Sequence, residues 1–300
     1  MRGDATTQEW TNRREFGALP LIKAYVWVAL HVGRPLMHLF LYPICLYFFF
    51  FSSSAKKASR AYLSRLFGRP ARNREVFRHF LTFAACLLDR VFLLNDQQRW
   101  FDITVHNEEL VHNIQLTGGG CLLFGAHFGS FEVARAVGRQ QKDLPISLLM
   151  YEENAQKIRA ALAAINPQLA VEVIGVGRMD SLISVANRLQ QGHFIGVLAD
   201  RNIDGRDLVR YPFLGAPAAF PKGPFRVALL LQSPIVMMVS VYRGAGRYDV
   251  YFEQLSPALA MRPADTEAWI EELMRRYIGR LEFHCHDAPF NWFNFYDFWG

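Results

Sequence analysis

A histidine and a glutamate stand five residues apart in the segment GGGCLLFGAHFGSFEVAR, residues 118–135. Residues 121–125 form a short apolar run bounded by glycines, a pattern typical of a buried strand. His127 follows this strand, and a Phe-Gly-Ser turn then leads into a helix that we predict over 131–141. Glu132 falls in the first turn of that helix. The spacing therefore predicts a general base, His127, whose imidazole is oriented by the Glu132 carboxylate.

A plainer interpretation of this pair is that Glu132 only complements the helix dipole and His127 is an ordinary loop residue. A single pair of this kind in a chain of 300 residues does not decide between the two. Further polar residues occur where functional side chains usually gather. The predicted strand 194–199 ends at Asp200, and the carboxyl ends of strands commonly carry binding or catalytic groups.

Two cations occur one helical turn apart further along the chain. Lys222 and Arg226 follow Pro221 at the predicted start of a helix, where proline is pre-organised and free backbone N–H groups favour anions. They can therefore face the same phosphate group. The alternative is a packing helix that carries two solvated cations.

The elements around these residues alternate between apolar runs and helical patterns from residue 145 to residue 200. This alternation predicts an α/β layered domain. Neither a G-x-G-x-x-G fingerprint nor a Walker loop is present, which argues against nucleotide binding. The G-x-S-x-G motif of the usual serine hydrolases is also missing. Residues 269–281 carry an apolar stripe at helical spacing, so we expect a core helix there.

The N-terminal part of the chain predicts attachment to a membrane. Residues 35–51 are apolar except for His38 and Pro43, and a second apolar stretch precedes them. Basic residues flank both ends, which favours a re-entrant or interfacial helix pair over a single crossing. A buried soluble hairpin is the alternative. We therefore divide the chain into a membrane-associated segment, 1–54, and an α/β domain, 55–300, which has a helical start and an aromatic tail.

Composition narrows the classes of partner and cofactor. The net charge of +6 comes mostly from arginine, which binds phosphate and carboxylate well, so we expect anionic lipid, phosphopantetheine or an acidic carrier protein as partners. Nucleic acid is not expected, since no such motif occurs and the charges form no single tract. The four cysteines are scattered among apolar residues and suggest reduced core residues. His284-Cys285-His286 lacks the spacing of a zinc site, so no metal is expected.

The H-x-x-x-x-E motif after a glycine-rich turn and an apolar strand, together with the F-x-G-x-P-A segment at 213–218, resembles the lipid A biosynthesis (lauroyl/myristoyl) acyltransferase family. The resemblance covers roughly residues 20–285. It implies a layered fold like that of the glycerolipid acyltransferases, which share the motif. It also implies that His127 is the base that deprotonates an acceptor hydroxyl and that Glu132 orients it.

The resemblance extends to residues expected to bind substrate. Arg178 and Asp200 fall where the family carries a basic residue before a helix and an acidic strand end. The family's D-x-D-x-G spacing is loosened here to D-x-x-x-D-G, which leaves the role of Asp204 open. Arg178, Lys222 and Arg226 are expected to meet the phosphate or sugar of the acceptor, and Asp200 is expected to bind substrate as well. Backbone N–H groups near Gly129 are expected to stabilise the oxyanion.

We therefore expect a bacterial inner-membrane acyltransferase whose catalytic domain faces the cytoplasm. It moves a fatty acyl chain from acyl carrier protein, or from acyl-coenzyme A, to a hydroxyl of a membrane glycolipid, with neither metal nor nucleotide cofactor. A thioesterase that uses the same pair with water is one alternative, and a non-catalytic lipid-binding scaffold is another.

The aromatic tail, residues 289–299, departs from the basic tails of the lipid A enzymes. This departure leaves a second group of acceptors open, another glycolipid or a polyene-type lipid. Aromatic residues at this density predict a membrane interface or the lid of a lipid groove.

Overall fold

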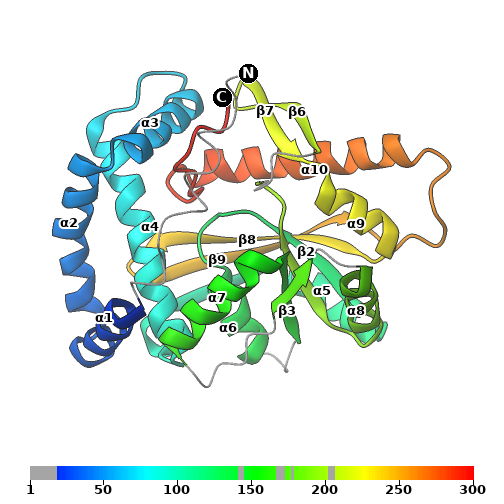
Figure 1. The fold of residues 1–300 in the computed structure, drawn as a ribbon, viewed down its shortest axis with the longest axis horizontal. Coiled ribbons are helices and arrows are strands. Elements are labelled where there is room, and N and C mark those ends of the chain that lie inside the picture. The colour runs from blue at the N-terminus through cyan, green and yellow to red at the C-terminus, as the bar shows by residue number, and fades with distance from the viewer. Residues whose placement is uncertain (1–18, 141–144, 167–172, 177–178, 202–206) are drawn as a thin grey trace.

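The structure is a computed structural model that describes residues 19–140, 145–166, 173–176, 179–201 and 207–300. Helices dominate the N-terminal third, and strands alternate with helices after that (Figure 1). In chain order the elements are α1 (Leu19–Val32), α2 (Arg34–Phe51), α3 (Ser53–Phe67), α4 (Asn73–Leu94), β1 (Asp102–His106), α5 (Glu108–Leu116), β2 (Cys121–Gly125), α6 (Phe131–Gln140), β3 (Ile146–Tyr151), α7 (Glu152–Ile165), β4 (Val173–Val176), α8 (Met179–Gln190), β5 (Phe194–Leu198), β6 (Leu208–Phe213), β7 (Ala216–Pro221), α9 (Gly223–Leu231), β8 (Ile235–Gly244), β9 (Arg247–Ser256) and α10 (Thr266–Asp287).

A seven-stranded sheet with the strand order β1-β9-β8-β2-β5-β3-β4 forms the centre of the molecule. All neighbouring strands in it are parallel except β8 and β9, which pair antiparallel. The central strand β2 reads CLLFG and is buried at every position. A continuous apolar run of this kind is typical of a parallel strand that is covered on both faces. The mixed α/β fold predicted from the sequence is confirmed.

Helices cover both faces of the sheet. Leu122 and Phe124 point from β2 toward one core, where Phe124 meets Phe225 of α9 and Tyr277 of α10 with ring centroids 5.3 and 6.2 Å apart. Cys121 and Leu123 point to the opposite core, which includes residues of α5 and α6. Side chains alternate between the faces of a strand, so β2 is held between two helical layers.

The small hairpin β6–β7 was not expected from the sequence. It forms a separate two-stranded sheet, which Figure 1 shows above the long helix α10. Its turn is made by Leu214 and Gly215, which both have positive φ, 51° and 76°. A two-residue turn with positive φ at both positions matches the twist of a hairpin. The F-x-G-x-P-A segment therefore builds this turn and the strand after it, and α9 begins only beyond Pro221.

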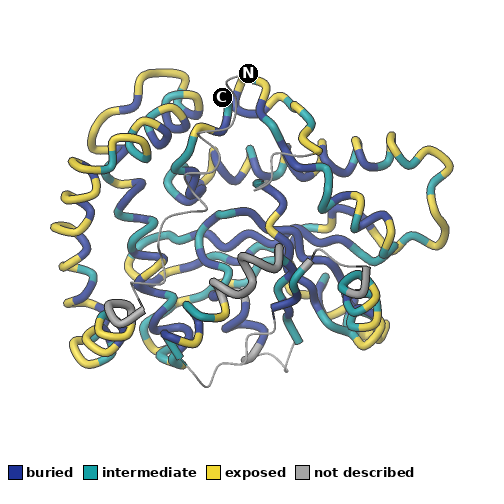
Figure 2. The backbone as a smooth tube through the Cα atoms, in the orientation of Figure 1, coloured by how far each residue is buried: buried dark blue, intermediate teal, exposed yellow. Residues whose placement is uncertain are grey.

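The first two helices pack against α4, at the left of Figure 1. In α2 the residues Met37, Leu41, Cys45 and Phe49 are buried, one at almost every turn. The other sides of α2 carry large apolar side chains that are exposed, and Figure 2 shows the outer edge of this helix in yellow. Within the part of the chain that the structure describes, α2 is the one helix long and apolar enough to cross a membrane. Length and composition alone do not separate a membrane span from a core helix or a signal sequence.

A buried ion pair fixes the start of α2 to the rest of the fold. Arg34 donates two hydrogen bonds to Asp89 of α4, with Nε–Oδ1 at 2.7 Å and Nη2–Oδ2 at 3.0 Å. The Tyr248 hydroxyl of β9 donates to the same carboxylate at 2.8 Å. Burial raises the pKa of Asp89, while the guanidinium and the hydroxyl oppose that effect. This network crosses the boundary predicted at residue 54, so α2 shares buried polar contacts with the α/β part.

The aromatic tail after α10 packs inward, contrary to the expectation of a membrane interface or a lid. Trp292 is fully buried and Phe298 is nearly so. The Trp292 ring meets Tyr62 of α3 edge to face, with centroids 5.0 Å apart. In Figure 1 the tail is red and lies between α3 and the near end of α10. Its aromatic residues therefore form core between the helical and α/β parts, because they can bury more area there than at a surface.

Candidate active site

His127 and Asp200 are brought together by the register of two central strands. Strand β2 pairs with β5 in parallel so that Gly125 lies opposite Leu198. His127 and Asp200 each follow two residues after that last pair. Because neighbouring parallel strands end at the same edge of a sheet, the two side chains emerge next to each other.

The Asp200 carboxylate holds the His127 imidazole through its Nδ1 atom. Nδ1 lies 2.8 Å from Asp200 Oδ1, and the backbone N–H of His127 donates to Oδ2 at 3.0 Å. Trp292 Nε1 also donates to Oδ2, at 3.1 Å. An ionised carboxylate accepts from Nδ1–H, so the Nε2 atom is left unprotonated. The imidazole is 35% exposed, so Nε2 can take a proton from a bound molecule.

The electrostatic surroundings keep this pair as a neutral imidazole and an ionised carboxylate. Burial alone would raise the pKa of Asp200, but the imidazole, Arg201 and the hydrogen bonds outweigh it and lower that pKa below its ordinary value. Burial, aided by the positive charge of Arg201, lowers the pKa of His127 despite the opposing charge of Asp200. A base in this state is ready to accept a proton at neutral pH.

Glu132, the expected partner of His127, has other contacts. Its Oε1 lies 2.9 Å from Nε of Arg90 on α4, and its Oε2 accepts from the Ser130 hydroxyl at 3.3 Å. No hydrogen bond or ion pair of the described residues joins Glu132 to His127. The first turn of α6 directs Glu132 toward α4, whereas the strand register places Asp200 against the imidazole. The predicted orienting contact is therefore replaced by one from Asp200, a residue that we had expected to bind substrate.

Gly129 is committed to the backbone around it. Its φ is 58°, a conformation that glycine adopts without strain, and a Cβ atom there would overlap the Ser240 carbonyl oxygen. Its N–H donates to the Asn291 carbonyl oxygen at 2.9 Å. That amide is therefore engaged, which does not support the predicted oxyanion role for Gly129 itself.

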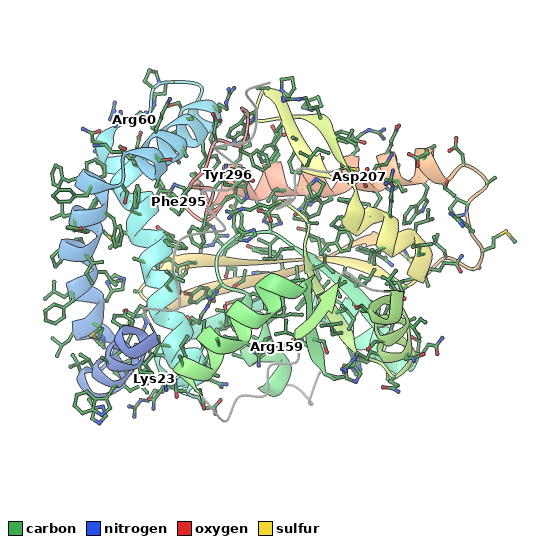
Figure 3. The ribbon with its side chains drawn as sticks, in the orientation of Figure 1. Lys23, Arg60, Arg159, Asp207, Phe295 and Tyr296 are labelled. Atoms are coloured by element: carbon green, nitrogen blue, oxygen red, sulfur yellow. The ribbon has the colours of Figure 1, made fainter. Side chains whose placement is uncertain are left out.

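The aromatic tail runs along the His127 loop and hydrogen-bonds to it. The Phe293 N–H donates to the His127 carbonyl oxygen at 2.7 Å. Arg201 donates through Nη2 to the Phe293 carbonyl oxygen, and its guanidinium lies 5.1 Å from the centroid of the Tyr296 ring. Figure 3 shows Tyr296 and Phe295 between the N-terminal helices and α10. The tail therefore binds both strand ends that carry the pair.

A buried histidine on α4 holds the tail in place. His79 contacts the Trp292 carbonyl oxygen through Nε2 at 2.9 Å and the Ser59 hydroxyl of α3 through Nδ1 at 2.8 Å. Burial lowers the pKa of His79 to about 4, so the ring is neutral at neutral pH. Nε2–H then donates to the carbonyl oxygen and Nδ1 accepts from Ser59.

Lys222 and Arg226, which were also predicted to bind substrate, each have a carboxylate partner of their own. Lys222 forms an ion pair with Glu267, and Arg226 Nη1 lies 2.7 Å from Asp207 Oδ2. Figure 3 shows Asp207 well separated from Tyr296 across the view. A phosphate site shared by Lys222 and Arg226 stays a prediction, since each cation already has a carboxylate partner. Arg178 and Asp204 lie outside the described residues.

The His-Cys-His sequence near the end of α10 takes part in packing and ion pairing. His284 is buried and its Nε2 lies 3.0 Å from Glu253 Oε1, while Cys285 is fully buried. Among the residues that the structure describes, no group of three His, Cys, Asp or Glu side chains is placed to hold a metal ion.

A comparison with known protein families gives a match to the chain. The sequence model of the family described as bacterial lipid A biosynthesis acyltransferase matches residues 11–299. A search of curated proteins finds no match. The match spans nearly the whole chain, from the start of the N-terminal helices to the end of the aromatic tail.

The indole N–H of Trp292 predicts a measurable effect on His127. Trp292→Phe removes one donor from the Asp200 carboxylate but keeps a buried ring. Loss of a hydrogen bond to a charged group costs about 1.5–3 kcal/mol, so we expect acyl transfer to slow by roughly 10- to 100-fold. The less stabilised carboxylate should also raise the pKa of His127 and move the acidic limb of the pH–rate profile upward.

Trp299→Phe is the matched control, because its indole N–H donates at 3.3 Å to the Phe213 carbonyl oxygen and not to Asp200. Trp292→Phe should unfold at the lower temperature, because a fully buried residue loses a bond to a charged group, and while both variants are folded only Trp292→Phe should change the pH–rate profile. Equal rates and profiles for the two variants would contradict this role of Trp292.

Proposed function

Because the chain belongs to the bacterial lipid A biosynthesis acyltransferase family, we propose that it transfers a fatty acyl chain to a lipid A-like acceptor by general-base catalysis at His127. Family membership supports an acyltransferase of lipid biosynthesis that uses an acyl donor and a lipid acceptor. The observation that carries the mechanism is the His127–Asp200 contact at the carboxyl ends of β2 and β5. It provides an oriented, neutral base with a free Nε2 atom.

The reaction follows from this geometry. Nε2 of His127 removes the proton from an acceptor hydroxyl while the hydroxyl oxygen attacks the carbonyl carbon of an acyl thioester. A carbon–oxygen bond forms and the carbonyl electrons move to oxygen. When the carbonyl re-forms, the carbon–sulfur bond breaks, and the imidazolium returns the proton to the thiolate. The Asp200 carboxylate stabilises the imidazolium between these two steps, as in other histidine–carboxylate pairs.

We propose acyl carrier protein as the donor, with acyl-coenzyme A as the alternative. Both donors are anionic, and the chain has a net charge of +6, so either would be attracted to it. As the acceptor we propose a membrane lipid that carries a phosphate or a sugar, which Arg178, Lys222 and Arg226 would bind. Lys222 and Arg226 would have to exchange their carboxylate partners, Glu267 and Asp207, for the lipid.

We also propose that the exposed apolar face of α2 attaches the enzyme to the cytoplasmic side of the inner membrane. Large side chains such as Phe40, Tyr47 and Phe51 are more than half exposed on this helix. Families of this kind are typically membrane-associated. An apolar face of this extent is unfavourable in water and favourable at a bilayer surface.

The general-base mechanism predicts how variants and pH change the rate. His127→Ala should abolish transfer, and Asp200→Asn should reduce kcat by roughly 10²- to 10⁴-fold, because the imidazole loses its orientation and its charge partner. The pKa of His127 is lowered from its ordinary 6.5. A protonated imidazole cannot act as a base, so kcat/KM should rise with pH through that lowered pKa and reach a plateau by neutral pH.

Asp102→Asn is the control for loss of a carboxylate, since Asp102 is exposed on β1. It should keep wild-type kinetics. Folded Asp200→Asn protein that turns over like Asp102→Asn would overturn the mechanism.

The exposed face of α2 predicts binding to lipid vesicles. Each large apolar side chain that enters a bilayer contributes about 1.5–3 kcal/mol, so replacing Leu39, Phe40 and Phe51 with Ser should weaken vesicle binding by roughly 10³-fold or more. Leu116, Ile183 and Met261 are also highly exposed but lie on other parts of the molecule. Their replacement with Ser is the control and should leave co-sedimentation with vesicles unchanged. If both triple variants co-sediment alike, α2 is not the membrane contact.

A further inference from the structure

One arginine of α4, which pairs with Glu132 on the helix that follows His127, has hydrogen-bond donors that no described residue uses. Arg90 lies near the end of α4 and is 33% exposed, although its neighbours Asp89 and Val91 are buried. Its Nε faces the Glu132 carboxylate at 2.9 Å. In the described part of the chain, its two terminal nitrogens have no hydrogen-bond partner. The guanidinium is thus held from one side and open on the other.

Arg34 shows what a purely structural arginine looks like in this fold. It pairs with Asp89, the residue next to Arg90, through two parallel hydrogen bonds, and its side chain is only 7% exposed. Two such bonds match the fork of a guanidinium to a carboxylate and fix both groups. Arg90 makes a single contact with Glu132 instead. The difference leaves its terminal N–H groups without a partner among the described residues, so they can bind a ligand.

The charge of Arg90 also acts on His127. Burial is the main cause that lowers the pKa of His127, and the charges of Arg201 and Arg90 add to it. Arg201 is already engaged, by the Phe293 carbonyl oxygen and the Tyr296 ring. Arg201 thus has one terminal nitrogen bound to a backbone oxygen, whereas neither terminal nitrogen of Arg90 has a partner among the described residues.

The buried carboxylate of Glu132 explains how Arg90 is held. The Glu132 side chain is 9% exposed, and the Ser130 hydroxyl fixes its second oxygen. An ion pair that is partly exposed, as this one is through Arg90, adds little stability, so its presence next to the His127 loop calls for another explanation. Because Glu132 follows His127 by five residues on the next helix, it links the position of Arg90 to that of the base.

We propose that Arg90 binds an anionic oxygen at the reaction centre, and that Glu132 acts as the positioning residue for Arg90 rather than for the imidazole. The inference rests on the proposed acyl transfer at His127. The favoured anion is the oxygen of the thioester carbonyl, which gains the carbonyl electrons when the acceptor oxygen attacks and returns them when the carbon–sulfur bond breaks. A guanidinium that is already in place stabilises this charge without reorganisation.

A phosphate oxygen of the lipid acceptor offers the same chemistry to Arg90. The two sources differ in which reaction they affect. Stabilisation of the thioester oxyanion also accelerates the slow attack by water on the donor, whereas binding of the acceptor phosphate affects only transfer. Donor hydrolysis without any acceptor therefore separates them.

The experiment compares Arg90→Met with Arg74→Met, an exposed arginine on the same helix. Transfer is measured with fatty-acyl carrier protein and a detergent-dispersed lipid A precursor, and hydrolysis is measured with the donor alone. Loss of one oxyanion donor typically lowers kcat by about 10²- to 10³-fold. We expect Arg90→Met to lose about this much in both reactions, with little change in KM for the donor. Arg74→Met should behave like the wild type.

Glu132→Gln tests the positioning role. It should lower kcat by less than Arg90→Met does, and the double variant should be no slower than Arg90→Met alone, since both changes remove one function. Arg90→Met should also raise the pKa in the acidic limb of the pH–rate profile, because a positive charge near His127 is gone. Added guanidinium ion should partly restore Arg90→Ala and leave Arg74→Ala unchanged.

Three outcomes of these measurements distinguish the possible roles of Arg90. Loss of kcat in both reactions supports the thioester oxyanion, and a raised KM for the acceptor with normal hydrolysis supports a lipid phosphate. Folded Arg90→Met protein with wild-type kcat and KM in both reactions overturns the proposal. If that variant is active while His127→Ala is inactive, only the role of Arg90 fails. If His127→Ala is active, the proposed acyl-transfer mechanism itself fails.

Discussion

A buried carboxylate stays ionised in an apolar interior only when hydrogen-bond donors surround it, and Asp200 receives three of them. One comes from the His127 imidazole, one from the backbone N–H of His127 and one from the Trp292 indole. The first bond fixes the tautomer of the base, and the other two keep the carboxylate charged. Removal of any of these donors would change the protonation equilibrium of the His127–Asp200 pair. This interaction depends on the strand register, which places Asp200 next to His127. It also depends on the tail, which supplies Trp292, and on the helices that hold the tail.

This dependence joins segments that are far apart in the chain. Trp292 reaches Asp200 from the tail, and His79 of α4 holds the Trp292 carbonyl oxygen from the other side. The same helix, α4, also carries Asp89, which fixes α2, and Arg90, which faces Glu132. The helical third of the protein therefore supports the proposed active site as well as the proposed membrane attachment. A change in the packing of these helices can therefore alter the surroundings of His127 without a direct contact to His127.

The sequence predicted much of the fold, because strands such as residues 121–125 and helices such as residues 131–141 carry clear apolar patterns and turn residues. It also identified His127 and Asp200 as separate candidates. Their contact escaped the sequence because it depends on which strands become neighbours, and β5 follows β2 by three helices and two strands in the chain. Glu132 was paired with His127 because local spacing is visible, whereas Arg90 lies on a distant helix. Trp292 was misjudged since an aromatic run does not show whether it packs inward.

The central claim is that Asp200, and not Glu132, sets the protonation of the His127 imidazole. Nitrogen-15 NMR of labelled histidine, with the His127 signals assigned from a His127→Gln spectrum, tests it directly. We predict an Nδ1-protonated, neutral ring at neutral pH, with that tautomer lost in Asp200→Asn and retained in Glu132→Gln. An Nε2-protonated ring in the wild type, or a tautomer that changes with Glu132 and not with Asp200, would contradict the account.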